Sequence, residues 1–140
     1  MFEHDDDRTL LARLIWGEAR GESFLAKCAV GLSVWNRTGR YKWWGHTLRE
    51  VILHPWQYSA FNENDVNLEK LKDPTRHEGP WVWQVCLDPA DMVLATYLID
   101  WTLGATHYHD TSIEPPDWAT AEGSYETLRE GSFIFYAGVK

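Results

Sequence analysis

One stretch of the sequence has no polar face, and it constrains the fold more than any other feature. Residues 28–35 read Cys-Ala-Val-Gly-Leu-Ser-Val-Trp, so nearly every position is apolar or small. A helix of this composition has to be surrounded by other elements, because each exposed face would place apolar surface in water. The sequence therefore predicts a central buried helix, capped by Ser23 and running to about Arg37. Its small residues let neighbouring helices approach closely: Ala26, Ala29, Gly31 and Ser33.

Another helix is expected just before the central one. Asp7 can cap it by accepting the free amide hydrogens of its first turn, and the helical pattern continues to about Ala19. Gly21 follows as the residue that ends it. Position 18 of this helix falls on the same apolar stripe as Leu11, Leu14 and Ile15.

Glu18 occupies that stripe position, so its carboxyl group is directed toward the interior. Partial burial disfavours the ionised carboxylate, and so does the negative end of the helix dipole in the last turn. Both effects raise the pKa of Glu18, as a general acid working near neutral pH requires. The alternative is a surface ion pair with Arg20 or Lys27, against which the apolar register argues.

Length and charge limit what the chain can be. Its 140 residues predict a single domain, 1–140, in which residues 1–7 form an acidic, flexible leader. The net charge of -8 repels phosphate backbones, so we expect no nucleic-acid partner. No apolar run is long enough to cross a bilayer, and we expect no membrane insertion. Cys28 and Cys86 are too few for a disulfide framework and are predicted to be reduced core residues.

The rest of the chain changes character twice. Between Thr38 and Pro80, glycines and prolines punctuate the sequence, and only Thr47 to Leu53 has a helical pattern. A third long helix is predicted from about Pro89 to Leu103, ended by Gly104. Two segments with strand composition, Ala105 to His109 and Ser132 to Tyr136, are expected to pair. The predicted fold class is α+β, mainly α, with a short antiparallel β-ribbon.

Aromatic residues are unusually frequent, with nine Trp in the chain. Flat rings with a polar edge suit sugar rings, and four of them lie in breaker-rich stretches where they are candidates for a binding groove: Trp43, Trp44, Trp81 and Trp83. Gln57 and Ser59 add polar groups beside Tyr58 and Phe61, a mixture suited to binding sugar. The alternative is that these aromatic residues fill the core or anchor a loop.

Four blocks of sequence resemble the SleB-type cell-wall hydrolases, the family that includes spore cortex-lytic enzymes. The resemblance spans roughly positions 10 to 137. The blocks are Leu14 to Glu22, Ala29-Val30 through Asn36-Arg37, Gln57 to Phe61, and Gly104 to His109 followed by Pro115-Pro116 and Trp118-Ala119. Two departures are a short Trp101-Thr102-Leu103 connection and Phe133 where relatives often carry a histidine.

The resemblance implies a small lysozyme-like fold that cleaves peptidoglycan glycan strands between N-acetylmuramic acid and N-acetylglucosamine, as a lytic transglycosylase or muramidase. Glu18 matches the family's catalytic glutamate, which acts first as general acid and then as base. Glu22, four residues later, is a possible second carboxyl. We instead expect Glu22 to support the N-terminus of the next helix or to pair with Arg20.

His107 and His109 alternate along a strand, so both imidazoles face one side. With Asp110 or His77 as a third ligand they would form a zinc site, which keeps a zinc-dependent cell-wall amidase or peptidase as an alternative. A His-x-His pair without a clear third ligand is a weak signal, and we expect neither a metal nor another cofactor. The segment is instead expected to line a sugar-binding groove through Thr106, His107, Tyr108 and His109.

The leading hypothesis is therefore an enzyme that acts on peptidoglycan as a monomer. A catalytically silent peptidoglycan-binding module is the alternative from a different class. The acidic start of the chain lacks the basic residues and apolar stretch of a secretion signal. We therefore expect synthesis in a bacterial or host cytoplasm before release to the cell wall, as for a phage-encoded lysis enzyme or a virion-associated hydrolase.

Overall fold

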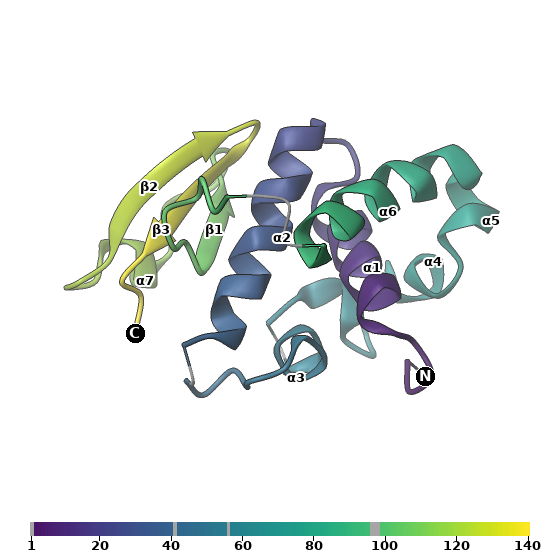
Figure 1. The fold of residues 1–140 in the computed structure, drawn as a ribbon, viewed down its shortest axis with the longest axis horizontal. Helices are drawn as coiled ribbons and strands as arrows, with labels where there is room; N and C mark the ends of the chain where they lie inside the picture. The colour runs from purple at the N-terminus through teal and green to yellow at the C-terminus, as the bar shows by residue number, and fades with distance from the viewer. Residues whose placement is uncertain (1, 41, 56, 96–98) are drawn as a thin grey trace.

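The computed structural model describes residues 2–40, 42–55, 57–95 and 99–140, except for the side chain of residue 77. A mainly helical α+β fold is present, as predicted, with the helices packed beside one small sheet (Figure 1). In chain order the elements are α1 (Asp7–Ala19), α2 (Phe24–Thr38), α3 (Leu48–Leu53), the 3-10 turn η1 (Ser59–Phe61), α4 (Leu68–Lys72), α5 (Pro74–Glu78), α6 (Pro80–Leu94), β1 (His107–Asp110), α7 (Asp117–Thr120), β2 (Tyr125–Glu130) and β3 (Phe133–Ala137).

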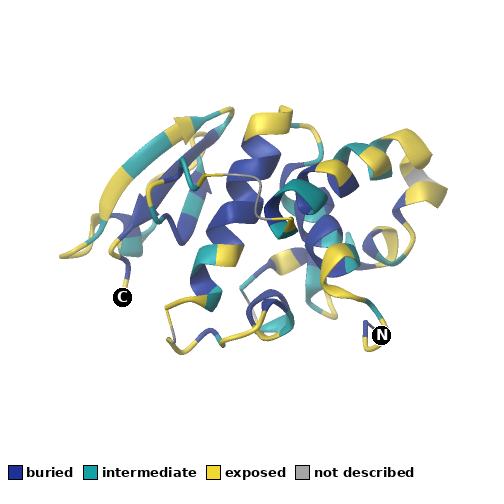
Figure 2. Cartoon of the chain, in the orientation of Figure 1, coloured by how far each residue is buried: buried dark blue, intermediate teal, exposed yellow. Residues whose placement is uncertain are grey.

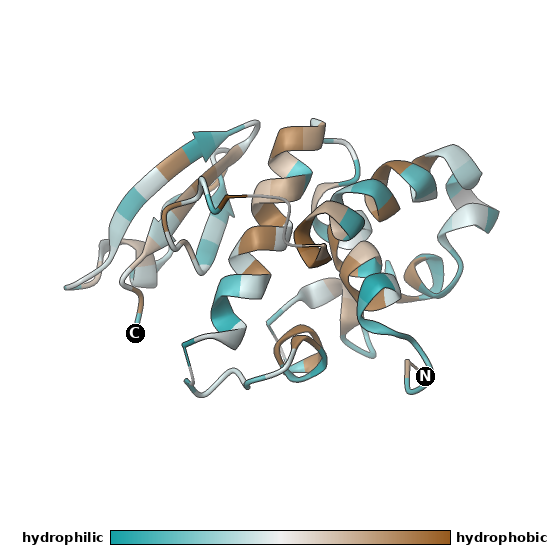
Figure 3. Cartoon of the chain, viewed as in Figure 1, coloured by the Kyte–Doolittle hydropathy of each residue, from teal (hydrophilic) through white to brown (hydrophobic). Residues whose placement is uncertain are grey.

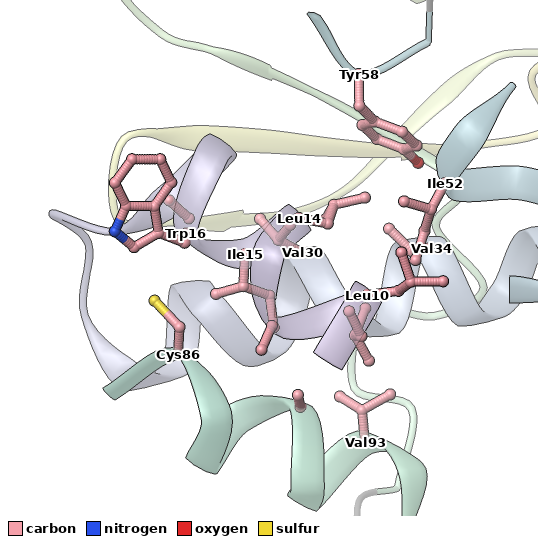
Figure 4. Packing of buried hydrophobic residues seen from close by; sticks show 14 of the residues in the cluster. Leu10, Leu14, Ile15, Trp16, Val30, Val34, Ile52, Tyr58, Cys86 and Val93 are labelled. Carbon is pink, nitrogen blue, oxygen red and sulfur yellow. The ribbon is translucent and has the colours of Figure 1, made fainter. Parts of the chain in front are cut away.

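Helix α2 is the central element. It contacts α1 and α6 on one side and the sheet on the other, and it is buried along most of its length (Figures 1 and 2). Gly31 permits the close contact with α6, because a Cβ there would lie 3.0 Å from Cγ2 of Val93. Side chains from α1, α2, α3 and α6 meet in one hydrophobic core (Figure 4). The prediction of a surrounded central helix is confirmed.

Capping residues set the starts of three helices. Ser23 accepts a hydrogen bond from the amide of Ala26, as the sequence predicts. Thr47 accepts one from the amide of Glu50, a cap that was not predicted. The prediction for α1 was wrong by one residue, since Asp6 is the cap and accepts from Thr9. Asp7 is instead the first helical residue, where a carboxylate also interacts favourably with the helix dipole.

The predicted position of the third long helix was wrong. Helix α6 begins at Pro80 and ends at Leu94, so Pro89 lies inside it. Gly79, with a φ of 86°, and Pro80 in the first turn provide the start. Proline inside a helix removes one backbone hydrogen bond, which is why Pro89 was interpreted as a start. Here Pro89 is buried in a helix that packs against both α1 and α2.

Two further regions differ from the expectations. The stretch from Thr38 to Pro80 contains α4, α5 and η1 in addition to α3. The predicted third helix does not extend to Leu103, because residues 101–104 form a turn and residues 99–100 have no regular secondary structure. Residues 96–98 of that prediction lie outside the described residues. Leu103 and Gly104 both have positive φ there, at 56° and 82°, which turns the chain toward β1.

Strand β3 lies in the middle of an antiparallel sheet with the order β1-β3-β2. The predicted ribbon is confirmed, since β1 pairs with β3 and His107 lies opposite Tyr136. Strand β2 was missed because its polar composition matches its position at the sheet edge, and it is mostly hydrophilic or neutral in Figure 3. None of the helices in the described part of the chain is both long and apolar enough to span a membrane.

Candidate active site

Glu18 lies in the last turn of α1 and lines a cavity of about 300 Å³. Its neighbour Gly17 allows the chain around η1 to approach α1, because a Cβ on Gly17 would lie 3.0 Å from Cβ of Ala60. This contact brings Gln57 and Tyr58, which precede η1, into the same cavity. The expected placement of Glu18, at the end of a helix and facing inward, is confirmed.

Burial is the main influence on the Glu18 carboxyl. Desolvation raises its pKa above the usual value, and a longer-range interaction with Asp65 acts in the same direction. A hydrogen bond from Tyr108 and the positive charge of Arg37 oppose part of this increase. The balance favours a carboxyl that holds its proton more strongly than an exposed glutamate, which is the property of a general acid.

Tyr108 is the direct partner of Glu18. Its hydroxyl donates a hydrogen bond of 2.6 Å to Oε1 of the carboxyl, and its ring packs against Phe133 and Phe135 of β3. Burial and the nearby Glu18 raise the pKa of Tyr108 well above 10, so the phenol stays protonated and remains a donor. Tyr108 therefore fixes one oxygen of Glu18 and leaves the other free to exchange a proton with a substrate.

Arg37 is a site residue that the sequence analysis did not single out as functional. It lies near the end of α2, is 5% exposed and lines the same cavity as Glu18. Its Nε donates to the carbonyl of Thr106 at 2.7 Å, and its Nη1 donates to Oε1 of Gln57 at 2.8 Å. The guanidinium thus joins α2 to the segments before η1 and β1. The sequence did contain a signal for Arg37, because a charged residue near the end of a helix that is predicted to be buried needs polar partners.

The turn before β1 is held by polar groups. Asn36 donates from Nδ2 to Oδ2 of Asp100 and to the carbonyl of Ala105, at 3.0 and 2.9 Å. Asp100 also accepts from the amides of Thr102 and Gly104. Together with Arg37, this network fixes the segment that carries Tyr108 into the site. Asn36 and Arg37, which are adjacent in the sequence, therefore both hold the segment before β1 in place.

His107 lines the cavity as an uncharged imidazole. Burial, together with the positive charges of Arg37 and Lys42, lowers the pKa of His107 to about 3. Its Nδ1 lies 2.9 Å from Oγ1 of Thr106, and its ring is tilted against Trp118. A neutral imidazole can bind sugar hydroxyls but does not carry charge at the pH of a cell.

The two histidines of β1 face the same side of the strand, as predicted, since both rings contact Trp118. The ring nitrogens of His109 lie within hydrogen-bond distance of the carbonyl of Asp110 and the hydroxyl of Tyr136. Among the described residues, no group of three or more His, Cys, Asp or Glu side chains could hold a metal ion. The side chain of His77, one of the proposed third ligands, lies outside this description.

Some of the predicted substrate-binding residues come together and others do not. Four of them line the cavity with Glu18, namely Gln57, Tyr58, His107 and Tyr108. Three do not line it. Ser59 is exposed in η1, Thr106 lines a separate cavity with Arg40 and Lys42, and His109 is buried against Tyr136. The contribution of Thr106 is its carbonyl oxygen, which holds Arg37.

Of the four tryptophans predicted as candidates for a binding groove, only one lines the cavity. Trp43 is 54% exposed and lines the cavity, whereas Trp44 is fully buried with the Arg37 guanidinium over its ring. Trp81 is exposed and Trp83 contacts Arg13, and neither lines the cavity. Trp118 does line it and was overlooked as a functional residue, although it belongs to one of the blocks that carry the resemblance.

Glu22 does not line the cavity that contains Glu18. Its carboxylate accepts a hydrogen bond of 2.6 Å from the amide of Ser132, in the turn between β2 and β3. The ion pair of Glu22 with Arg20, one of the two expected roles, is not found among the described residues, and Arg20 pairs with Glu78 at 3.0 Å. Glu22 therefore joins the start of α2 to the sheet.

A family model described as Cell Wall Hydrolase matches residues 21–136, which is most of the chain. The chain belongs to the cell wall hydrolase family. The matched region begins after Glu18, so the assignment of a role to Glu18 rests on the geometry described above. None of the curated proteins is similar to this cell wall hydrolase at the level of sequence.

Among solved structures, this cell wall hydrolase is similar to the catalytic domain of the germination-specific lytic transglycosylase SleB from Bacillus anthracis. The two share 20% sequence identity and a TM-score of 0.70, and the alignment covers 95% of each chain. At this identity the similarity establishes the fold. Together with the family match, it confirms the resemblance to SleB-type cell-wall hydrolases.

Proposed function

We propose that this cell wall hydrolase cleaves the glycan strand of peptidoglycan between N-acetylmuramic acid and N-acetylglucosamine, with Glu18 as the general acid and then the base. The observation that carries the proposal is the Glu18 carboxyl itself. Burial raises its pKa, a hydrogen bond from Tyr108 orients it, and it faces a cavity lined by aromatic rings. These are the requirements for proton transfer to a glycosidic oxygen beside a bound sugar.

In the first step the protonated Glu18 gives its proton to the glycosidic oxygen. The bond between C1 and that oxygen breaks, the electron pair stays with the leaving sugar, and positive charge develops at the ring. In the second step the Glu18 carboxylate takes the proton of the C6 hydroxyl while O6 bonds to C1. The product is a 1,6-anhydro sugar, and Glu18 returns to its protonated form.

One feature of the cavity favours this transglycosylase route over hydrolysis. Among the described residues that line the cavity, Glu18 carries the only carboxyl side chain. Glycosidases that hydrolyse usually place two carboxyl groups on either side of the bond, about 5 to 9.5 Å apart. A single carboxyl that serves as acid and then as base needs no second one. The second candidate reaction is hydrolysis, in which Glu18 is again the acid and water attacks C1.

The products of digestion test the proposal. Purified sacculi are incubated with the protein, and the soluble muropeptides are separated and weighed by mass spectrometry. We expect anhydro-muramyl ends, which are 18 mass units lighter than the corresponding reducing ends because one water is absent. Reducing ends alone would support hydrolysis. Release of free stem peptides with intact glycan, or binding without any soluble product, would contradict glycan cleavage.

A further inference from the structure

One guanidinium nitrogen of Arg37, Nη2, donates no hydrogen bond to another described residue. Its Nε and Nη1 are bound to Thr106 and Gln57, and its guanidinium lies over the rings of Trp44 and Tyr58. Its Nη2 has no hydrogen-bond partner among the described residues. This nitrogen is not among the buried polar atoms that lack a partner, so it has some access to solvent, and Arg37 lines the Glu18 cavity.

The guanidinium of Arg37 also lacks a close ion pair, although its charge acts on Glu18 at longer range. Within the described residues no carboxylate lies within 4 Å of the guanidinium, although the side chain is only 5% exposed. Its two partners are neutral carbonyl oxygens. A buried cation without an ion pair is costly for folding. Its geometry is nevertheless fixed by two hydrogen bonds and two ring faces, as expected for a group prepared to bind a ligand.

We propose that Nη2 of Arg37 binds a carbonyl or carboxylate oxygen on a substituent of the amino sugar that occupies the Glu18 cavity. The proposal rests on the proposed function, because it takes the ligand to be a peptidoglycan glycan. A cavity of about 300 Å³ is at the small end of ligand sites and suits one substituted sugar ring. A guanidinium N–H is only a donor, and carbonyl or carboxylate oxygens are its strongest acceptors.

Two substituents of the glycan carry such an oxygen. One is the acetamido group at C2, whose carbonyl is neutral. The other is the lactyl group at C3 of muramic acid, which ends in an amide where a stem peptide is attached and in a carboxylate where the peptide has been removed. Arg37 is thereby a specificity-determining residue, and it makes the rate depend on one of these two substituents.

The test compares Arg37→Lys with the wild type on three glycan substrates. They are peptide-bearing acetylated strands, strands freed of peptide by an amidase, and strands chemically freed of N-acetyl groups. Lysine keeps the positive charge near Glu18 but loses the planar arrangement of donors. The measured quantity is the ratio of wild-type to variant rate on each substrate. Differences in this ratio between substrates do not depend on the fraction of variant that is folded.

If the acetamido carbonyl is the ligand, the rate ratio falls about tenfold, toward one, on de-N-acetylated strands. If the lactyl oxygen is the ligand, the wild type gains about tenfold on peptide-free strands and Arg37→Lys does not. A rate ratio that is equal on all three substrates, within a factor of about two, overturns the proposal. Absence of glycan cleavage by the wild type on every substrate would instead contradict the proposed function.

Arg40→Lys is the matched control. Arg40 is exposed, it does not line the Glu18 cavity, and its guanidinium only approaches the carbonyl of Gly104 at 3.4 Å. We expect the same rate ratio for this variant on all three substrates. Substrate dependence in Arg40→Lys as large as in Arg37→Lys would show that the effect is not local to the cavity and would also overturn the proposal.

Discussion

The hydroxyl of Tyr108 donates a hydrogen bond of 2.6 Å to Oε1 of Glu18, and so joins two residues that are 90 positions apart in the sequence. Glu18 lies in the last turn of α1 and Tyr108 lies on β1. The bond therefore links the helical part of the molecule to the sheet at the group proposed to transfer the proton. It also leaves the second carboxyl oxygen available to the substrate.

Replacing Tyr108 by Phe is expected to change the pH profile as well as the rate. The hydrogen bond from Tyr108 lowers the pKa of Glu18, so its loss raises that pKa. The fall in activity on the alkaline side, where Glu18 loses its proton, then moves to higher pH. The rate at the optimum falls about tenfold, because a hydrogen bond that orients the carboxyl is lost. The measurement is glycan release from sacculi between pH 5 and 9.

Tyr136→Phe is the control for this variant. The Tyr136 hydroxyl lies 3.1 Å from Nε2 of His109, and Tyr136 does not line the Glu18 cavity. An unchanged pH profile in Tyr108→Phe, or an equal shift in both variants, would contradict a direct influence of Tyr108 on Glu18.

Replacing Glu18 by Gln is expected to stabilise the fold at pH 7 but not at pH 4. The pKa of Glu18 is raised in the folded state, so the folded protein binds the proton more strongly than the unfolded chain. Stability is then lost as the pH rises through the unfolded pKa, near 4.5, toward the folded one. Glutamine resembles the protonated form at every pH. We expect a gain of about 1 kcal/mol at pH 7 by urea unfolding, and an equal or larger gain at pH 4 would contradict the buried carboxyl.

His107 is expected to make the fold less stable as the pH falls, whereas Glu18 makes it less stable as the pH rises. Its folded pKa of about 3 lies below the ordinary histidine pKa of 6.5, so the unfolded chain binds the proton more strongly. Stability contributed by the neutral ring is therefore complete above pH 6.5 and decreases as the pH falls toward 3. His107→Gln should lose less stability than the wild type between pH 7 and 5, by about 1 kcal/mol in urea unfolding. Equal losses in both proteins would show that His107 is not buried as described.

Several features were predictable because neighbouring residues determine them. The composition of residues 28–35 required a surrounded helix, and the spacing of Glu18 from the leucines of α1 placed its carboxyl inward. Other features depended on packing that sequence does not display. Pro89 is buried inside α6, a helix that packs against α1 and α2, and these contacts between distant segments cannot be read from the sequence around the proline. The role of Arg37 could not be predicted, because its partners, the carbonyl of Thr106 and the side-chain amide of Gln57, are distant from it in the sequence.

A methyl group added to Gly17 should disturb the site without touching any of its side chains. The new Cβ would lie 3.0 Å from Cβ of Ala60, so the segment that carries Gln57 and Tyr58 has to move. We expect Gly17→Ala to lower stability by about 1 to 3 kcal/mol, as overpacking does, and to reduce activity with it. Gly21→Ala is the control, because nothing lies within 4 Å of its added Cβ. Equal stability of the two variants would contradict the described contact.

The proposed function requires that the carboxyl of Glu18 transfer the proton to the glycosidic oxygen. The most direct measurement is the rate of soluble glycan release from purified sacculi by Glu18→Gln and Glu22→Gln, each compared with the wild type. Both variants keep the fold if their circular dichroism matches the wild type. We expect Glu18→Gln to lose at least about a hundredfold in rate and Glu22→Gln to stay within about threefold, since a glutamine oxygen can still accept from Ser132. A Glu18→Gln variant as active as Glu22→Gln would show that Glu18 does not transfer the proton.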